Sequence, residues 1–205
     1  MKIVFVDGIF KTMVKHASEW RKDMKRLLVV VDMQKDFIDG SLGTKEAQAI
    51  VPGVAARIRE YLKAGDEVVF TLDTHGEDYL DTQEGKKLPV VHCVKGTKGW
   101  ELHPEIEALR RKEPIDKPAF GSTKLGSILC AMDKEYKMRA MDGLESVTFV
   151  GLCTDICVIS NAMIAKASVP EVPIIVDGNC CAGVTPESHK NALEAMKMCQ
   201  ITCLE

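Results

Sequence analysis

The sequence predicts an α/β fold: a single domain of three layers, αβα, with a mostly parallel, Rossmann-like sheet of about six strands and helices on both faces. Short apolar runs rich in β-branched residues alternate along the chain with segments of helical periodicity. No repeat or low-complexity tract interrupts this alternation. A length of 205 residues suits one domain with a single large core. Such alternation favours right-handed βαβ crossovers, and therefore parallel strands.

The expected strands are short apolar runs bounded by polar residues or glycine. The first, RLLVVVD at 26–32, is apolar along its whole length, which is typical of a strand that is buried on both faces. The expected strands are 26–32, 67–73, 88–94, 146–152 and 172–178, with 200–204 as a last candidate.

The expected helices have apolar residues at helical spacing. One covers 47–64 and stops at Gly65, and others cover 122–132 and about 154–168. The last covers 185–198, with Thr185 as its cap and a proline at its first helical position.

Residues 1–26 differ from the rest and are treated as an N-terminal extension to a domain at 27–205. They contain seven Lys or Arg against three acids. A rough apolar stripe at helical spacing runs through Phe10, Met13, Ala17, Trp20 and Met24. Two interpretations are equally supported. The residues are either an extra segment, derived from cloning or from an upstream start site, or an arm that packs on a neighbouring subunit.

Composition limits the classes of partner and compartment. A net charge of −3 gives no basic field, so we expect neither nucleic-acid nor membrane binding. No apolar run approaches the roughly 20 residues that span a bilayer. Most of the eight cysteines sit in apolar segments of a chain too long to need disulfides. They are therefore interpreted as reduced thiols in a cytoplasmic protein.

Polar side chains gather at the ends of the expected strands. Asp32 ends the first, Asp73 the second and His92 the third, and Cys153 and Cys157 follow the fourth. Because ligands bind outside the carboxyl ends of parallel strands, these residues are expected along one rim. Alone, Asp32 is either a satisfied turn or capping residue, or a general base whose proton affinity burial raises.

Two imidazoles and a carboxylate form a candidate metal site. Asp73 and His75 share one strand end, and His92 follows seventeen residues later. Glu84 lies between the histidines and is a fourth candidate ligand, whereas the neighbouring Cys93 points the other way and is assigned to the core. Such a set accepts Zn²⁺, Mn²⁺ or Fe²⁺, although an Asp-x-His pair is often incidental.

The two cysteines of the segment CTDIC, residues 153–157, have either a catalytic or a structural role. With Thr154 or Asp155 as the helix cap, Cys157 falls in the first turn, where free N–H groups and the helix dipole favour a thiolate. Cys153 would contribute only its backbone N–H. Two structural thiols are the alternative. Lys117, in an extended loop before a proline, matters if its ammonium lies near Asp32 and a thiolate.

Six segments in order resemble the isochorismatase-like cysteine hydrolases, and within them the nicotinamidases. They are LLVVVDMQKDF (27–37), TLDTHGED (71–78), LPVVHCVKGTKGWELHP (88–104), DKPAFGST (116–123), VGLCTDICV (150–158) and CAGVTPESHKNALEAM (181–196). Together they cover nearly everything after residue 26.

The resemblance implies roles for these residues. Cys157 is the nucleophile, Asp32 the general base and acid, and Lys117 the cation that holds both. Asp73, His75 and His92 are the metal ligands, joined by Glu84 in some members. A cis peptide bond is implied at Leu152–Cys153, with the N–H groups of Cys153 and Cys157 directed at one oxyanion.

The implied activity is metal-dependent hydrolysis of nicotinamide to nicotinate and ammonia through a cysteine thioester, a reaction of NAD salvage. Zn²⁺ is the expected ion, with Mn²⁺ or Fe²⁺ as alternatives, and a homo-oligomer acting on a small-molecule amide is expected. Phe37, Leu88 and Pro89 are assigned to the substrate pocket, where the last two replace the aromatic residue usual in nicotinamidases.

Two rival functions are weighed against this one. A hydrolase of another amide, carbamoyl or ureido substrate generally lacks the metal residues. A non-catalytic metal-binding scaffold would not need cysteine, lysine and aspartate together.

Overall fold

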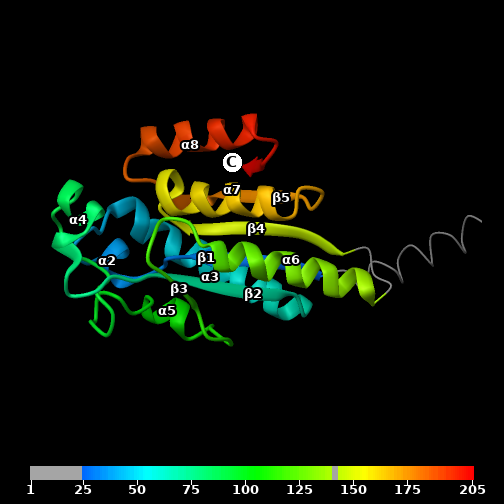
Figure 1. Ribbon diagram of the computed structural model, residues 1–205, viewed down its shortest axis with the longest axis horizontal. Coiled ribbons are helices and arrows are strands. Elements are labelled where there is room, and N and C mark those ends of the chain that lie inside the picture. Colours follow the sequence, from blue (N-terminus) through cyan, green and yellow to red (C-terminus); the bar gives the residue numbers. More distant parts are fainter. Residues whose placement is uncertain (1–24, 140–142) are drawn as a thin grey trace, which may run out of the picture.

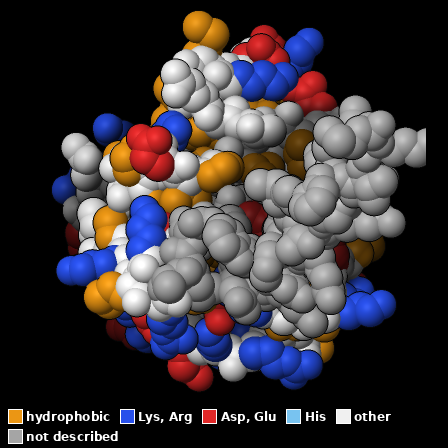
Figure 2. Space-filling model, turned by 90° about the vertical axis from the view of Figure 1, so that its right-hand side faces the viewer, with side chains coloured by type: hydrophobic (Ala, Val, Ile, Leu, Met, Phe, Trp, Pro, Cys, Tyr) orange, Lys and Arg blue, Asp and Glu red, His pale blue; other side chains and the backbone are white. Residues whose placement is uncertain are grey.

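The structure, a computed structural model, describes residues 25–139 and 143–205 as an αβα sandwich (Figure 1). The predicted N-terminal extension lies outside the described residues as far as residue 24, and strand β1 begins at Lys25. Within the described part of the chain, no helix has the length and apolar character needed to cross a membrane. Acidic and basic side chains are interspersed on the face shown in Figure 2 instead of forming one charged field.

Six strands form one sheet in the order β3-β2-β1-β4-β5-β6, and every neighbouring pair is parallel. This confirms the predicted fold class and strand number. The strands are β1 (Lys25–Val31), β2 (Glu67–Asp73), β3 (Ile115–Lys117), β4 (Leu144–Leu152), β5 (Ile174–Ala182) and β6 (Thr202–Leu204).

The α-helices are α2 (Lys35–Ile38), α3 (Lys45–Ala64), α4 (Gln83–Lys87), α5 (Pro104–Glu107), α6 (Thr123–Met138), α7 (Ile159–Ser168) and α8 (Pro186–Met198). A 3₁₀ turn, η1 (Tyr79–Asp81), and a π turn, η2 (Thr154–Val158), complete the set. The long helices end where local chemistry predicts. Thr44 caps α3, which stops at Gly65 in the left-handed region, and Thr185 forms a capping box with Ser188 on α8.

The core has two halves because successive strand residues point to opposite faces of the sheet. On β1, Leu28 and Val30 belong to the half that also contains the buried face of α3. Leu27, Val29 and Val31 belong to the half built with α6, α7 and α8. Figure 1 shows α6, α7 and α8 covering one face of the sheet while α3 lies behind it. The continuous apolar run of β1 is therefore explained by burial on both sides.

The prediction of a third strand at 88–94 is wrong, since the third strand is Ile115–Lys117. The segment instead lies against the end of β2, where Val94 forms an isolated parallel bridge with His75. Cys93 has a positive φ of 46°, which bends the chain, and its N–H donates to Asp36 Oδ2 at 2.7 Å. The apolar run is buried here as a loop, which its composition alone does not distinguish from a strand.

The sheet reverses its winding direction between β1 and β4. In open α/β sheets, ligands bind in the crevice at such a switch point, outside the carboxyl ends of the strands. Close approach of the two strands depends on Gly151, which has a φ of +116° and pairs with Val31. A Cβ atom there would lie 2.1 Å from the Val31 carbonyl oxygen, so a larger residue would separate β1 from β4.

Candidate active site

The predicted reactive residues converge on this edge from four strand ends. Asp32 follows β1, Asp73 ends β2, Lys117 ends β3, and Cys157 lies in η2 directly after β4. Asp73 and Lys117 are paired residues in the register of β2 and β3. The sheet therefore places the carboxylate and the ammonium side by side.

The Lys117 ammonium lies at the centre of the group. Its Nζ is 2.7 Å from Asp32 Oδ2, 3.0 Å from Asp73 Oδ1 and 3.3 Å from Cys157 Sγ. Burial opposes the charged ammonium, but the carboxylates of Asp32 and Asp73 outweigh it and hold the pKa of Lys117 above its usual value. The lysine is therefore a permanent cation between two carboxylates and a sulfur.

Asp32 is fully buried and has a positive φ of 46°. Its Oδ1 accepts a hydrogen bond of 2.6 Å from Thr71. Its Oδ2 has the Lys117 charge nearby, but among the described residues no donor is aligned to make a hydrogen bond with it. Burial raises the pKa of Asp32, and Lys117 opposes part of that increase. An oxygen in this state is suited to accept a proton from a neighbouring thiol.

The turn that carries Cys157 differs from the predicted helix start. Cys153, not Thr154 or Asp155, is the cap of η2, and its carbonyl accepts from the N–H groups of Ile156 and Val158. Thr154 instead hydrogen-bonds His189 Nδ1 at 2.7 Å, and Asp155 accepts from the Val184 N–H at 3.1 Å. Both side chains fix the turn to the segment around α8 and leave the capping position without a side-chain acceptor. The peptide bond Leu152–Cys153 is cis, as the resemblance implied.

Two effects at Cys157 oppose the stabilisation of a thiolate that is expected from the helix terminus. Only 4% of Cys157 is exposed, and burial together with the charge of Asp32 raises its pKa, which Lys117 opposes. Burial and the charge of Asp32 therefore both favour the thiol form of Cys157. A nearby base is required to ionise it when a substrate binds.

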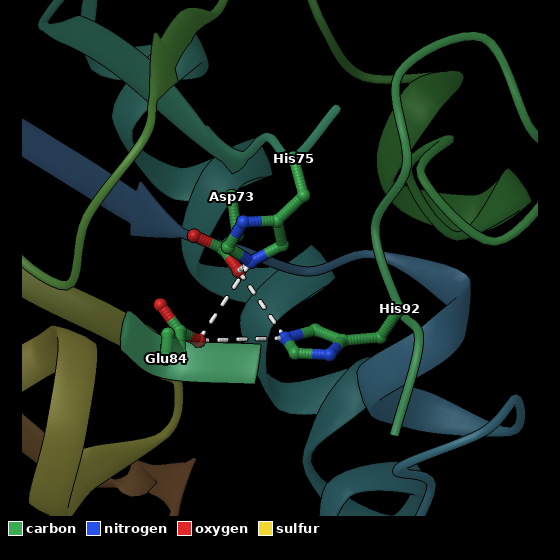
Figure 3. A group of neighbouring side chains, drawn as sticks. All are labelled: Asp73, His75, Glu84 and His92. Carbon is green, nitrogen blue, oxygen red and sulfur yellow. Dashed lines mark hydrogen bonds and ion pairs between the residues drawn. The ribbon is translucent and has the colours of Figure 1, made fainter. Parts of the chain in front are cut away.

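The four candidate metal ligands also come together (Figure 3). Single donor atoms from Asp73, His75, Glu84 and His92 all lie within 4.8 Å of one another. His75 Nε2 and His92 Nε2 are 3.0 and 3.6 Å from Asp73 Oδ2, and 3.7 and 3.8 Å from Glu84 Oε1. Two imidazoles and two carboxylates suit a divalent transition ion with positions left open.

His92 is oriented for this task by its other nitrogen. Its Nδ1 hydrogen-bonds the Val90 carbonyl at 2.8 Å, which leaves Nε2 directed at the cluster. Its ring also lies between aromatic neighbours, with centroids 5.5 Å from Phe37 and 4.9 Å from Tyr79. The donor set, its burial and this outer contact all fit a bound metal ion.

A cavity of about 760 Å³ opens above these groups. Phe37 and Leu88 line it as predicted, whereas Pro89 does not belong to its wall. Phe120, which was not among the predicted pocket residues, lines the same cavity from the loop after β3. Its position three residues after Lys117, at the edge that carries the other site residues, was an available signal.

Two buried amides were not predicted either. Gln34 brackets the end of β2, since its side chain bonds both the N–H and the carbonyl of Asp73, at 2.7 and 2.9 Å. Asn161 on α7 donates to the carbonyls of Cys157 and Phe120 at 2.8 and 3.1 Å and accepts from the Ser122 N–H at 3.0 Å. These residues hold the site from outside. Their amide side chains gave no sign of this, because their partners are distant backbone groups.

Comparison with known proteins identifies the family of the chain. A family model described as the isochorismatase domain matches residues 26–205. The nicotinamidase/pyrazinamidase of Mycobacterium tuberculosis is 29% identical, over 86% of this chain and 96% of the relative. The crystal structure of the Pyrococcus horikoshii pyrazinamidase in complex with zinc has a TM-score of 0.70 and 26% identity, covering 88% of this chain and 99% of that one. The nicotinamidase PncA of Bacillus subtilis has the same TM-score and identity, covering 89% and 100%. The chain thus belongs to the isochorismatase family, in which it is similar to the nicotinamidases.

Proposed function

We propose that the protein is a metal-dependent cysteine amidohydrolase that converts nicotinamide and water to nicotinate and ammonia through a thioester on Cys157. The observation that carries the proposal is the position of Lys117, whose ammonium contacts the nucleophile, the base and a metal ligand at once. Similarity to the nicotinamidases of Mycobacterium tuberculosis and Bacillus subtilis supports amide hydrolysis as the reaction class.

The first step activates the thiol. Asp32 Oδ2 accepts the proton of Cys157, and Lys117 stabilises the thiolate that forms. The raised pKa of Asp32 makes it a stronger base than an exposed aspartate, which favours transfer of the thiol proton to it. The thiolate then attacks the carboxamide carbon, and the N–H groups of Cys153 and Cys157 hold the developing oxyanion.

The second half of the reaction returns the proton. Protonated Asp32 delivers it to the departing nitrogen as the carbon–nitrogen bond breaks, which releases ammonia and leaves the thioester. Asp32 next accepts a proton from a water molecule that attacks the thioester. Collapse of that intermediate releases the carboxylate product, and the cysteine recovers its proton from Asp32.

Asp73, His75, Glu84 and His92 would hold the metal, with Zn²⁺ proposed and Mn²⁺ or Fe²⁺ as alternatives. The ion would supply a Lewis-acid contact that orients the substrate ring. A homo-oligomer in the cytoplasm, without nucleic-acid or membrane partners, is part of the same proposal.

The direct test is ammonia release from nicotinamide by the zinc-loaded protein, with Cys157→Ala as control. The variant is expected to be inactive, and a covalent adduct on Cys157 is expected by mass spectrometry after rapid acid quenching. Equal ammonia release by both proteins would refute the proposal. A panel of N-carbamoyl amino acids and ureido compounds tests the rival substrate class, and exclusive activity on that panel would replace nicotinamide as the assignment.

A further inference from the structure

The cavity is much larger than the reaction at its inner end requires. Cys157, Asp73 and His92 are buried there, so the carboxamide and the ring nitrogen of a nicotinamide would both be bound at the inner end. Nicotinamide is a single ring with one carboxamide. A volume of about 760 Å³ instead lies within the range of sites for much larger ligands, about 300–1,000 Å³.

The lining of the cavity includes exposed apolar side chains as well as polar ones. The polar lining residues Thr82, Gln83 and Lys87 come from α4 and its cap, and Thr44 is the cap of α3. Phe120, Ile156 and Val184 are apolar residues of the same lining, and we call these three residues the apolar wall. Phe120 and Val184 are 44% and 54% exposed, which is unusual for large apolar side chains gathered in one place.

The apolar wall is held in place by hydrogen bonds. Asn161 bonds the Phe120 carbonyl and the Cys157 carbonyl with the same amide nitrogen. Asp155, which directly precedes Ile156 in the chain, accepts a hydrogen bond from the Val184 N–H. Both Phe120 and Val184 are therefore tied to the turn that carries the nucleophile. An apolar surface fixed this firmly to the reactive turn has a constant position relative to the scissile bond.

We propose that the preferred substrates are aromatic carboxamides that carry an apolar ring substituent, and that this substituent packs against the apolar wall, with Phe120 as the main determinant of specificity. The inference rests on the proposed amide hydrolysis and extends it to a substrate class larger than nicotinamide. Apolar contact of this kind raises kcat/KM because the substituent leaves water while the reacting bond is held at the thiol.

The test compares nicotinamide with its phenyl derivatives, substituted at each free ring carbon in turn. The best phenyl isomer is expected to have a kcat/KM at least about tenfold above that of nicotinamide. Phe120→Ala is expected to lower this preference by about tenfold. The control Met198→Ala, which truncates an apolar side chain 85% exposed at the end of α8, is expected to leave the preference unchanged.

Binding to the Cys157→Ala variant, measured by calorimetry, separates this inference from the proposed function. If a phenyl isomer binds more tightly than nicotinamide but the wild-type protein hydrolyses neither compound, the role of the apolar wall in binding would be supported and the proposed hydrolysis refuted. Efficient hydrolysis of nicotinamide, with every phenyl isomer binding more weakly, would overturn the inference and leave the hydrolysis standing. An equal effect of Phe120→Ala on all substrates would also overturn it.

Discussion

The carboxylate of Asp73 joins the thiol site to the metal-ligand cluster through its contact with Lys117. Its Oδ1 lies 3.0 Å from the Lys117 ammonium, whereas its Oδ2 lies 3.0 Å from His75 Nε2 and 3.6 Å from His92 Nε2. Burial raises the pKa of Asp73, but its hydrogen bond with His75, its contact with His92 and the Lys117 charge outweigh burial and lower that pKa. One ionised side chain therefore affects the electrostatics of both centres.

Asp73→Asn is expected to disturb both centres at once. Metal affinity should fall by at least about tenfold, because a charged ligand is lost. In metal-free protein the pKa of Cys157 should also fall, because the charge of Asp73 contributes to raising it. Alkylation rates of Cys157 against pH, measured in chelator, report the second effect.

His75→Ala is the matched control for that change. His75 is a candidate ligand in contact with Asp73, but among the described residues its side chain forms no hydrogen bond or ion pair with Lys117 or Cys157. It should lose metal affinity while the alkylation profile stays where it is. Identical alkylation profiles for the two variants would contradict a linking role for Asp73.

Lys117→Met is expected to destabilise the protein by about 3–5 kcal/mol, because it leaves two buried carboxylates without their cation. Lys95→Met is the control, since Lys95 also pairs with an aspartate, Asp116, but its side chain is 62% exposed. That change should cost less than about 1 kcal/mol. Urea unfolding of the metal-free proteins measures both values, and equal losses would show that the buried ammonium has no special role.

The acid limb of kcat/KM should lie above the ordinary aspartate pKa of about 3.9, because burial raises the pKa of Asp32. Below the raised pKa of Asp32 its carboxyl group is protonated and cannot accept the thiol proton. Activity should therefore increase as the pH rises through the pKa of Asp32. Asp32→Asn should lower kcat by about 10²–10⁴-fold.

Thr71→Val tests the same assignment more gently. The Thr71 hydroxyl donates to Asp32 and lowers its pKa, so its removal should shift the acid limb to higher pH. A limb that does not move, in a variant whose Tm matches the wild type, would mean that another group controls it.

Chelation should abolish activity, and added Zn²⁺ should restore it. Affinity should also weaken as pH falls, because a protonated imidazole cannot bind the ion. Burial lowers the pKa of His92, but the nearby Asp73 carboxylate and the hydrogen bond with the Val90 carbonyl raise it by more, so the net shift is upward. Zinc titrations against a chromophoric indicator from about pH 8 to about pH 5 check this dependence. If zinc affinity did not change over that pH range, His92 would be excluded as a ligand.

The parallel α/β class and most of the strands follow from local sequence, because apolar runs such as 26–32 can only be buried between two layers. Local sequence also specifies which residue types stand at the carboxyl ends of β1, β2 and β4, since those positions come directly after the apolar runs. Asp32, Asp73 and Cys157 could therefore be predicted as neighbours from the amino-acid sequence.

Long-range contacts, in contrast, bring Lys117 and His92 to the site. A three-residue edge strand such as Ile115–Lys117 carries too little pattern to recognise, yet its pairing with β2 brings Lys117 beside Asp73. The apolar run at 88–94 fits a strand equally well, and its bend at Cys93 is fixed by Asp36, 57 residues away. Tertiary packing also sets the protonation states, because the pKa of Cys157 depends on burial and on charges from distant parts of the chain.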